Sequence, residues 1–448
     1  MRIVQLVGWY YPDGVGGTEV YVAALAKYLR AQGHDVTIAA PDPTCAHDRT
    51  YEHDGVPVYR YPIPAAATRD EAQGLVPVRG AEHFAAWLRR QRPDVVHAHA
   101  FVTGIGLWEL RMAREAGARV VATCHSGGLG WICQRGTMLR WGAALCDGIT
   151  VPTKCAACSL QQRGVPKVIA SVLAATPTRL SRMARRIPGK IGTTLSMRDL
   201  IARNVSMQAT MLDLVDHLVV LTRWAFDTVV ANGGRGEKVT LNRLGQSWST
   251  VMRKPGPDVR PTKPPIRIGY LGRFDPIKGV FDLARATRAL PADVPIEVEF
   301  RGPLRTATDR DVVAELQRLA GGDARVTVAE EVVPAGVVEV LRAYDVLCCP
   351  PVCLEGGPTV AIEAHAVGTP VIGTRIGGLA ELITDGVNGR LVPPGDWRQL
   401  ASVLEEIAVD PHNTVDRWRR TLPPARSMSD VAEDYLRLYA PRKEAVPA

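Results

Sequence analysis

Residues 355–381 read EGGPTVAIEAHAVGTPVIGTRIGGLAE, and this stretch decides the fold predicted for the second half of the chain. A helix is predicted to begin near Pro358, with Glu355 just before it and Glu363 about two turns along it. The two glycines after Glu355 let backbone amides approach a ligand closely. The helix N-terminus offers free N–H groups and a positive dipole end, which suit a diphosphate. Two carboxylates so placed can each bind a pair of sugar hydroxyls; the alternative is a helix cap plus one solvated glutamate.

A second motif, GRFDPIKG at residues 272–279, stands at the end of a predicted strand that begins at Ile266. Arg273 and Lys278 bracket a turn at the predicted carboxyl edge of the sheet. Two cations at this place can neutralise a diphosphate and stabilise it as a leaving group. Ordinary surface charge on a loop is the other interpretation of the same two residues.

The N-terminal half alternates strands and helices in the way that predicts a parallel sheet. A strand at residues 2–7 leads through a loop with four glycines to a helix, predicted to be capped by Thr18, and then to a strand at residues 36–40. Two further predicted strands end in His99 and His125. These ends lie at the sheet edge where open α/β sheets bind their ligands.

Five prolines between residues 255 and 265 exclude a helix or a central strand there and indicate an interdomain linker. The predicted organisation is an N-terminal domain at residues 1–254, a linker at 255–265, a second α/β domain at 266–415 and a helical segment at 416–448. The last amphipathic helix is predicted at residues 427–439, and the sequence does not show what it packs against.

The composition is that of an ordinary globular chain, with 448 residues, 46% hydrophobic and 22% charged. No apolar run approaches the roughly 18 residues that a membrane span needs. The N-terminus lacks the basic region and long apolar core of a signal peptide, so we expect a cytoplasmic protein. The net charge of +8 favours phosphorylated substrates or an anionic membrane surface. Nucleic acid is not expected as a partner, because no platform of interleaved aromatic and basic residues is present.

One basic stretch, TRLSRMARRIPGK at residues 178–190, holds Arg179, Arg182, Arg185, Arg186 and Lys190. Three of these arginines, at 182, 185 and 186, can share one face of a helix. A basic helical face attracts anionic lipid, which predicts peripheral contact with the inner face of the membrane. A solvated surface or an acceptor-binding surface is the alternative.

The order of motifs in the C-terminal half resembles the retaining GT-B glycosyltransferases of family 4. The motifs are GRF-x3-KG, E-x7-EA, G-x-PVI-x4-GG-x2-E and NG-x-LVPPGD, and the N-terminal GVGGTE loop is similar to the same family. The resemblance implies two Rossmann-like, doubly wound α/β domains that face a central cleft.

The resemblance also implies roles for individual residues. Two basic residues would bind the donor's diphosphate, one glutamate would hold hydroxyls of the donor sugar beside three amides, and a second glutamate would bind the nucleotide ribose. Two N-terminal glycines would approach the diphosphate, and one histidine would contact the transferred sugar. The diphosphate-binding residues are Arg273 and Lys278, and the sugar-binding glutamate is Glu355, beside the amides of Gly356, Gly357 and Thr359. The ribose-binding glutamate is Glu363. The two N-terminal glycines are Gly16 and Gly17, and the histidine is His125.

The function implied is retaining transfer of a sugar from a UDP- or GDP-linked donor to a glycan, glycolipid or small-molecule acceptor, with no cofactor required for catalysis. Residues 328–330 depart from the turn that is usual in the family, so the sequence does not decide between a uracil and a guanine base in the donor. The alternatives are a catalytically idle GT-B scaffold in a polysaccharide assembly complex, a GT-B nucleotide-sugar epimerase and a phosphorylase. A dinucleotide oxidoreductase is disfavoured because G-x-G-x-x-G is absent.

Four of the nine cysteines cluster in the N-terminal half with the spacing C-x12-C-x8-C-x2-C, at Cys133, Cys146, Cys155 and Cys158. A C-x-x-C pair places two thiols on one turn, as tetrahedral zinc and iron–sulfur sites require. The spacing therefore predicts a structural zinc ion or iron–sulfur cluster. Four partly buried thiols without a metal are the alternative, because cysteine is often buried without a further role.

Overall fold

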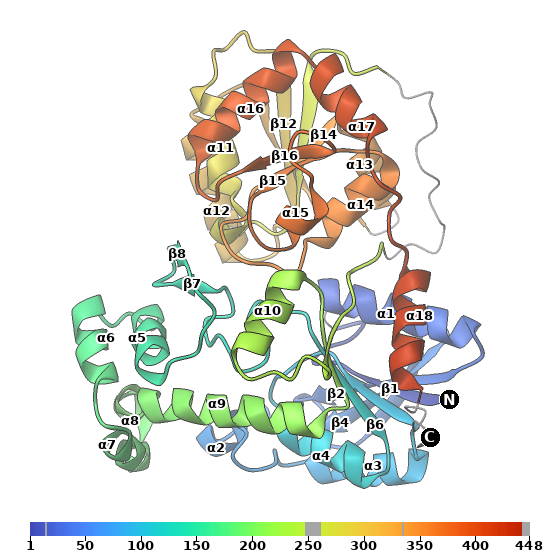
Figure 1. Ribbon diagram of the computed structural model, residues 1–448, viewed down its shortest axis with the longest axis vertical. Coiled ribbons are helices and arrows are strands. Elements are labelled where there is room, and N and C mark those ends of the chain that lie inside the picture. Colours follow the sequence, from blue (N-terminus) through green and yellow to red (C-terminus); the bar gives the residue numbers. More distant parts are fainter. Residues whose placement is uncertain (14–15, 247–260, 334–335, 441–448) are drawn as a thin grey trace, which may run out of the picture. The chain divides into compact units, whose positions relative to one another are not determined.

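The computed structural model describes residues 1–13, 16–246, 261–333 and 336–440, and it divides into two compact units (Figure 1). The first unit comprises Met1–Arg243 and Met428–Ala448, and the second comprises Leu244–Ser427. Residues 255–260 of the predicted linker lie outside the described residues. Thr262, near the end of that linker, is buried, and its backbone N–H and its hydroxyl both donate to Asp416 Oδ1, at 3.1 and 2.6 Å.

An eight-stranded sheet forms the centre of the first unit as described, in the order β10-β9-β6-β5-β1-β2-β4-β3. Only the β3–β4 pairing among these strands is antiparallel. The strands are β1 Arg2–Leu6, β2 Asp35–Asp42, β3 Arg49–His53, β4 Val56–Pro62, β5 Val95–Ala98, β6 Arg119–Cys124, β9 His217–Val220 and β10 Val239–Leu241. The apolar character of the central parallel strands follows from burial on both faces, whereas the polar edge strand β3 is largely exposed.

Helices connect and cover these strands. They are α1 Gly17–Ala31, α2 Arg69–Ala72, α3 Ala81–Gln91, α4 Leu107–Glu115, α5 Pro152–Gln162, α6 Lys167–Ala174, α7 Thr178–Met183, α8 Gly189–Leu195, α9 Met197–Leu214, α10 Arg223–Ala231 and α18 Met428–Tyr439. A small antiparallel pair, β7 Leu139–Arg140 and β8 Ala144–Leu145, lies between β6 and α5. None of the helices in the described ranges combines the length and apolar character needed to cross a membrane.

The last helix, α18, packs in the first unit although the chain reaches it from the second. Val431, Tyr435 and Tyr439 lie on its buried face, as the amphipathic pattern predicts. The Tyr435 hydroxyl lies 2.9 Å from Thr123 Oγ1 on β6, and it accepts a hydrogen bond from Tyr21 on α1 at 3.0 Å. The helix that the sequence left without a partner therefore completes the N-terminal core.

A six-stranded parallel sheet, in the order β13-β12-β11-β14-β15-β16, forms the centre of the second unit as far as it is described. Its strands are β11 Ile266–Leu271, β12 Ile296–Gly302, β13 Val326–Glu330, β14 Val346–Cys349, β15 Val371–Thr374 and β16 Gly389–Val392. Its helices are α11 Val280–Ala289, α12 Ala307–Ala320, α13 Val337–Ala343, α14 Thr359–Val367, α15 Gly377–Leu382, α16 Trp397–Val409 and α17 Arg417–Arg420. The prediction of two parallel α/β units is confirmed.

Two local predictions are wrong. Gly16, not Thr18, is the N-cap of α1, because the Glu19 side chain accepts the Gly16 N–H at 2.8 Å and the helix begins at Gly17. Glu363 lies about one turn into α14 rather than two, because that helix begins only at Thr359.

Candidate functional site

The sheet of the second unit has a topological switch between β11 and β14. The chain runs from β11 to β12 on one side and returns to β14 on the other, so the loops after β11 and β14 diverge at the carboxyl edge. Open α/β sheets bind ligands at such a point. The GRFDPIKG loop follows β11 and the loop to Glu355 follows β14, so both predicted donor motifs lie at this switch.

The two loops touch through their backbones. The Val352 N–H donates to the Ile277 carbonyl at 2.9 Å. Gly279 lies so close to Pro350 that a Cβ there would stand 1.8 Å from the Pro350 carbonyl oxygen, and its φ of +79° also favours glycine. A glycine at this position is therefore what allows the loop after β11 to close against the loop after β14.

This contact brings two predicted site residues together. Lys278 Nζ forms an ion pair with Glu355 Oε1, and the two side chains are 24% and 18% exposed. Partial burial strengthens such a pair relative to one in open water. A cation and an anion thus lie side by side at the carboxyl edge of this sheet.

Arg273 approaches the same loop differently. Its carbonyl accepts a hydrogen bond from the buried Tyr270 hydroxyl at 2.6 Å, which fixes the backbone, while the residue itself is exposed. The guanidinium is therefore available to solvent at a defined position of the turn.

A second close backbone approach, between Gly378 and Gly357, holds the turn before α14. The Gly378 N–H donates to the Glu355 carbonyl at 3.0 Å, and a Cβ on Gly378 would lie 2.5 Å from Gly357 Cα. Gly357 has φ +102°, which few side chains tolerate. Gly356 and Gly357 thus lie directly before the helix that begins at Thr359 and carries the half-buried Glu363. The structure places the four predicted residues Lys278, Glu355, Gly356 and Gly357 within these two joined loops.

In the first unit, the predicted His125 ends a chain of buried polar groups. His125 follows β6, and its Nε2 lies 3.0 Å from His99 Nδ1. His99 follows β5, and its Nε2 lies 2.6 Å from Gln5 Oε1. Gln5 in turn donates from Nε2 to the Tyr439 hydroxyl at 3.3 Å. His97 joins the same hydroxyl through Nδ1 at 2.6 Å and meets Thr123 through Nε2 at 2.7 Å.

The direction of these hydrogen bonds follows from charge and from the Gln5 amide. Burial lowers the pKa of His125 to about 4, and burial also lowers the pKa of His99 well below its usual range, so both rings are neutral at pH 7. Because the Gln5 oxygen can only accept, His99 donates from Nε2 and accepts at Nδ1. His125 must then donate from Nε2, which leaves its Nδ1 as an acceptor.

Of these histidines, the sequence indicates a functional role for His125 and none for His97 or His99. The signal that could have found His99 is the polar Gln5 inside the apolar β1 strand, paired in register with His97. A buried polar side chain needs a partner, and His97 on β5 and His99 just after it provide candidates on the neighbouring strand.

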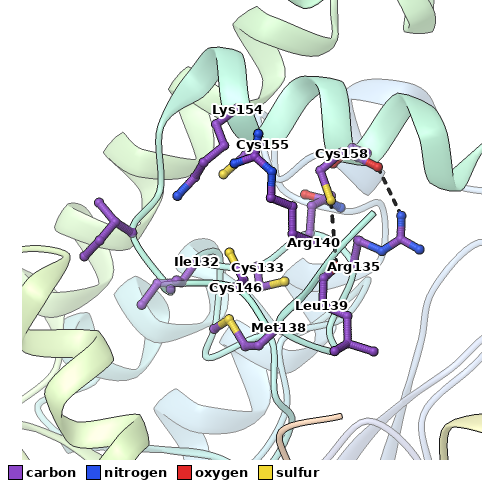
Figure 2. Close-up of a pocket in the computed structure, with 14 residues that line it drawn as sticks. Ile132, Cys133, Arg135, Met138, Leu139, Arg140, Cys146, Lys154, Cys155 and Cys158 are labelled. Carbon is purple, nitrogen blue, oxygen red and sulfur yellow. Dashed lines mark hydrogen bonds between the residues drawn. The ribbon is translucent and has the colours of Figure 1, made fainter. Parts of the chain in front are cut away.

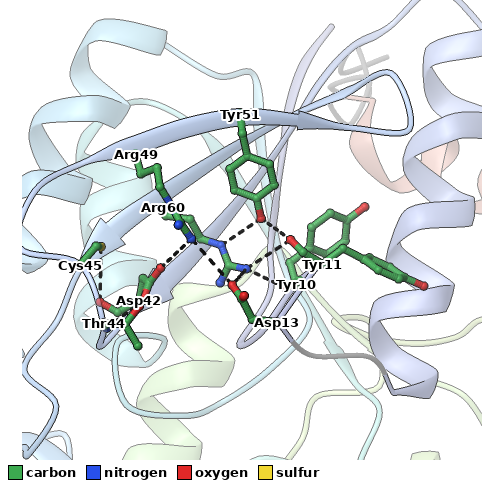
Figure 3. A network of polar contacts seen from close by, with 9 residues as sticks. All are labelled: Tyr10, Tyr11, Asp13, Asp42, Thr44, Cys45, Arg49, Tyr51 and Arg60. Atoms are coloured by element: carbon green, nitrogen blue, oxygen red, sulfur yellow. Dashed lines mark hydrogen bonds and ion pairs between the residues drawn. The ribbon is translucent and has the colours of Figure 1, made fainter.

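The loop that leads to Gly16 and Gly17 is anchored by one buried arginine (Figure 3). Arg60, with a side chain only 3% exposed, donates to the Tyr10 carbonyl at 2.6 Å and contacts Asp13 at 3.3 Å. Its Nε donates to the Tyr51 hydroxyl at 3.2 Å. Gly16 and Gly17 are exposed at the start of α1, where the Glu19 carboxylate already accepts the Gly16 N–H.

The four clustered cysteines line one pocket of the first unit (Figure 2). As these side chains stand, no group of three or more His, Cys, Asp or Glu residues in the described parts of the chain is placed to hold a metal ion.

Comparison with known proteins identifies the family of this chain. The model of Glycosyltransferase Family 4 matches residues 15–172, and the model of Glycosyl transferases group 1 matches residues 265–410. This chain belongs to the GT-B glycosyltransferases. The prediction of a GT-B glycosyltransferase is thereby confirmed, and the first of these matches is consistent with family 4.

The relatives of this GT-B glycosyltransferase include two D-inositol 3-phosphate glycosyltransferases. That of Paenarthrobacter aurescens is 26% identical over 92% of this chain and 89% of the relative. That of Kribbella flavida is 33% identical over 33% of this chain, and the match spans only 36% of the relative's length. Among solved structures, sucrose-phosphate synthase from Thermosynechococcus elongatus has a TM-score of 0.64 at 18% identity, covering 98% of both chains. Anabaena Alr3699/HepE in complex with UDP has a TM-score of 0.62 at 15% identity, covering 98% of this chain and 99% of that one.

The hydrogen-bond chain predicts the tautomer of His125. At pH 7 we expect a neutral ring with its proton on Nε2, which stays neutral until the pH falls to about 4, because burial disfavours the charged form. Nitrogen-15 NMR of the imidazole as a function of pH measures both properties.

Gln5→Leu, which removes the acceptor for His99, is expected to shift the tautomer population of His125. His83, a surface histidine paired with Asp48, serves as the internal control. A proton on Nδ1 of His125, or titration near the ordinary 6.5, would contradict the assignment.

Proposed function

We propose that this protein transfers a sugar from a nucleoside-diphosphate sugar to a glycan, glycolipid or small-molecule acceptor, with retention of the anomeric configuration. The observation that carries the proposal is the Lys278–Glu355 pair at the switch between β11 and β14, beside the glycine turn that opens α14. The pair offers a cation for phosphate and a carboxylate for hydroxyls in one place. Solved neighbours in complex with UDP and with UDP-glucose support this class of donor.

In this proposal Lys278 and Arg273 bind the diphosphate and stabilise the charge that develops as it leaves. Preorganised cations of this kind lower the barrier because they need no rearrangement when the charge appears. Glu355 holds donor sugar hydroxyls beside the amides of Gly356, Gly357 and Thr359. The ion pair with Lys278 keeps its carboxylate in position before the donor arrives.

Three further contacts complete the proposed donor site. Glu363 binds the nucleotide ribose, and Gly16 and Gly17 contact the diphosphate. His125 accepts a hydroxyl proton of the transferred sugar at Nδ1, the atom that the His99 contact leaves without a proton. A UDP- or a GDP-linked donor fits these contacts equally, because none of them reads the base.

We expect the double variant Arg273→Ala, Lys278→Ala to bind UDP or GDP about 3–6 kcal/mol more weakly, because two charge-assisted contacts of about 1.5–3 kcal/mol each are lost. Calorimetric titration measures the change. Arg318→Ala on α12 is the control, since this exposed arginine forms an ion pair with Glu315 on the same helix. Unchanged affinity in a folded double variant would remove the assignment.

The two carboxylates are expected to separate binding from turnover. Glu363→Ala should weaken free nucleotide and donor alike, whereas Glu355→Ala should mainly lower the rate, because it contacts the sugar and not the nucleotide. Binding and initial-rate measurements on both variants test this. The opposite pattern would mean that the roles are reversed, and binding without any transfer or epimerisation in the wild type would favour the idle scaffold.

We also propose that α6, α7 and α8 contact an anionic membrane surface. Residues 148–198 contain nine Lys or Arg residues and no Asp or Glu. The same segment exposes large apolar side chains to an unusual degree. They are Val168 (77%), Ile169 (53%) and Val172 (67%) on α6, Leu180 (56%) and Met183 (65%) on α7, and Ile191 (69%) on α8.

Exposed apolar side chains beside basic ones suit the interface of an anionic bilayer. The arginines do not share one helix face as predicted, because α7 ends at Met183. Arg182 pairs with Asp199 at 3.3 Å, and Arg185 pairs with Asp70 at 3.6 Å. The exposed Lys167, Arg179, Arg186 and Lys190 are therefore the cations proposed to meet lipid headgroups.

The membrane proposal predicts that the protein floats with vesicles that contain phosphatidylglycerol and that salt weakens the binding. Val168→Asp with Val172→Asp is expected to abolish flotation, because it places charge in the apolar surface. Val409→Asp on α16, which changes an equally exposed valine of the second unit, is the control. Equal recovery with neutral vesicles, or flotation of the double variant, would remove the proposal.

A further inference from the structure

Four thiols that are separated in sequence line one pocket of the first unit. Cys133 and Cys146 lie in the loop between β6 and α5, on either side of the β7–β8 pair. Cys155 and Cys158 lie three residues apart on α5, a spacing that places them on one face of the helix. All four line the same pocket, and Figure 2 shows their sulfur atoms on the pocket side of the loop and the helix.

The charges around the pocket suit thiolates. Arg135 and Arg140 line it, and Arg135 Nη1 is held by the Cys158 carbonyl at 3.1 Å and by Gln161 Oε1 at 2.9 Å. Lys154 also lines it and pairs with Asp147. Four thiolates on a divalent ion carry a net charge of −2, and two arginines at the same pocket offset that charge.

One thiol already accepts a backbone hydrogen bond. The Trp141 N–H points at Cys158 Sγ, with N and S 3.4 Å apart. Hydrogen bonds from backbone amides to sulfur are the outer contacts that orient thiolate ligands and stabilise their charge. The amide comes from the β7–β8 turn, so the hairpin and α5 are joined at the sulfur atom.

The backbone of this segment also lacks regular structure of its own. β7 and β8 have two residues each. Leu129, Met138 and Trp141 have positive φ angles of 49°, 53° and 57°, and they make up three of the five such non-glycine residues in the described chain. Each such residue costs on the order of 1–3 kcal/mol, so the loop needs a stabilising element besides its short strands.

We propose that Cys133, Cys146, Cys155 and Cys158 bind one structural Zn²⁺ ion. Four protein thiolates fill a tetrahedral site and leave no position open for chemistry, so the ion would shape the loop that follows His125. The thiols are only half-buried, which suits the redox-inert zinc ion better than an oxygen-sensitive cluster. Because the four side chains are not yet gathered around one point, binding must draw the loop cysteines toward α5.

Elemental analysis of the purified full chain tests the proposal. One equivalent of zinc is expected in the wild type, and Cys155→Ser with Cys158→Ser is expected to lose it. Cys45→Ser is the control, because Cys45 is half-buried in the same unit but outside the cluster. Substoichiometric zinc in the wild type, zinc retained by the double variant, or iron with sulfide in place of zinc would each overturn the proposal.

If the double variant fails to fold, measurements on the wild-type protein test the same proposal. A mercurial reagent titrated into wild-type protein is expected to release zinc in step with modification of four thiols. Replacement of zinc by Co²⁺ is expected to give the absorption bands of tetrahedral thiolate coordination. Zinc release without thiol modification, or a cobalt spectrum of octahedral type, would contradict the four-cysteine site.

Discussion

The candidate site depends on how closely two pairs of backbone segments approach each other in the second unit. Gly279 lies against the Pro350 carbonyl, and Gly378 lies against Gly357, with no room for a side chain in either contact. The first approach closes the loop after β11 onto the loop after β14, and the second joins the start of α15 to the turn before α14. Lys278 and Glu355 are the side chains next to the contacts, so their ion pair is a consequence of the packing and not of charge attraction alone. An alanine at Gly279, where a Cβ would stand 1.8 Å from the Pro350 carbonyl oxygen, would therefore separate the pair.

In the first unit, the main constraint is that His97 and His99 are buried and neutral. Each ring nitrogen of His97 and His99 meets a polar partner, and one of these partners, Tyr439, comes from the last helix of the chain. A buried polar group without such a partner would cost about 1–3 kcal/mol. The return of α18 to the first unit thus completes both the core and the hydrogen bonds that fix the protonation of His125.

The sequence predicts the parallel sheets, the helix at Pro358 and the switch-point motifs, because each depends on local patterns of apolar residues, glycine and proline. It does not predict the partner of α18, since that contact joins residues more than 300 positions apart. The sequence does not indicate roles for His99 and Gln5 for the same reason, because their hydrogen bond joins two different strand segments that are far apart in the chain. Thr18 was chosen as a cap from its residue type, but Glu19 reaches back to Gly16 and moves the helix start. The predicted face of three arginines does not form, because α7 ends at Met183. Arg182 and Arg185 instead pair with acidic residues.

The central claim is that a nucleotide-sugar donor binds at the switch between β11 and β14. Amide hydrogen exchange, followed with and without UDP- and GDP-linked sugars, tests it most directly because it locates the contact along the chain. Donor binding at this switch predicts slower exchange in the donor's presence over residues 272–280 and 355–364, with α12 unchanged. Protection absent from both of these segments, with a donor that binds elsewhere on the chain, would contradict it.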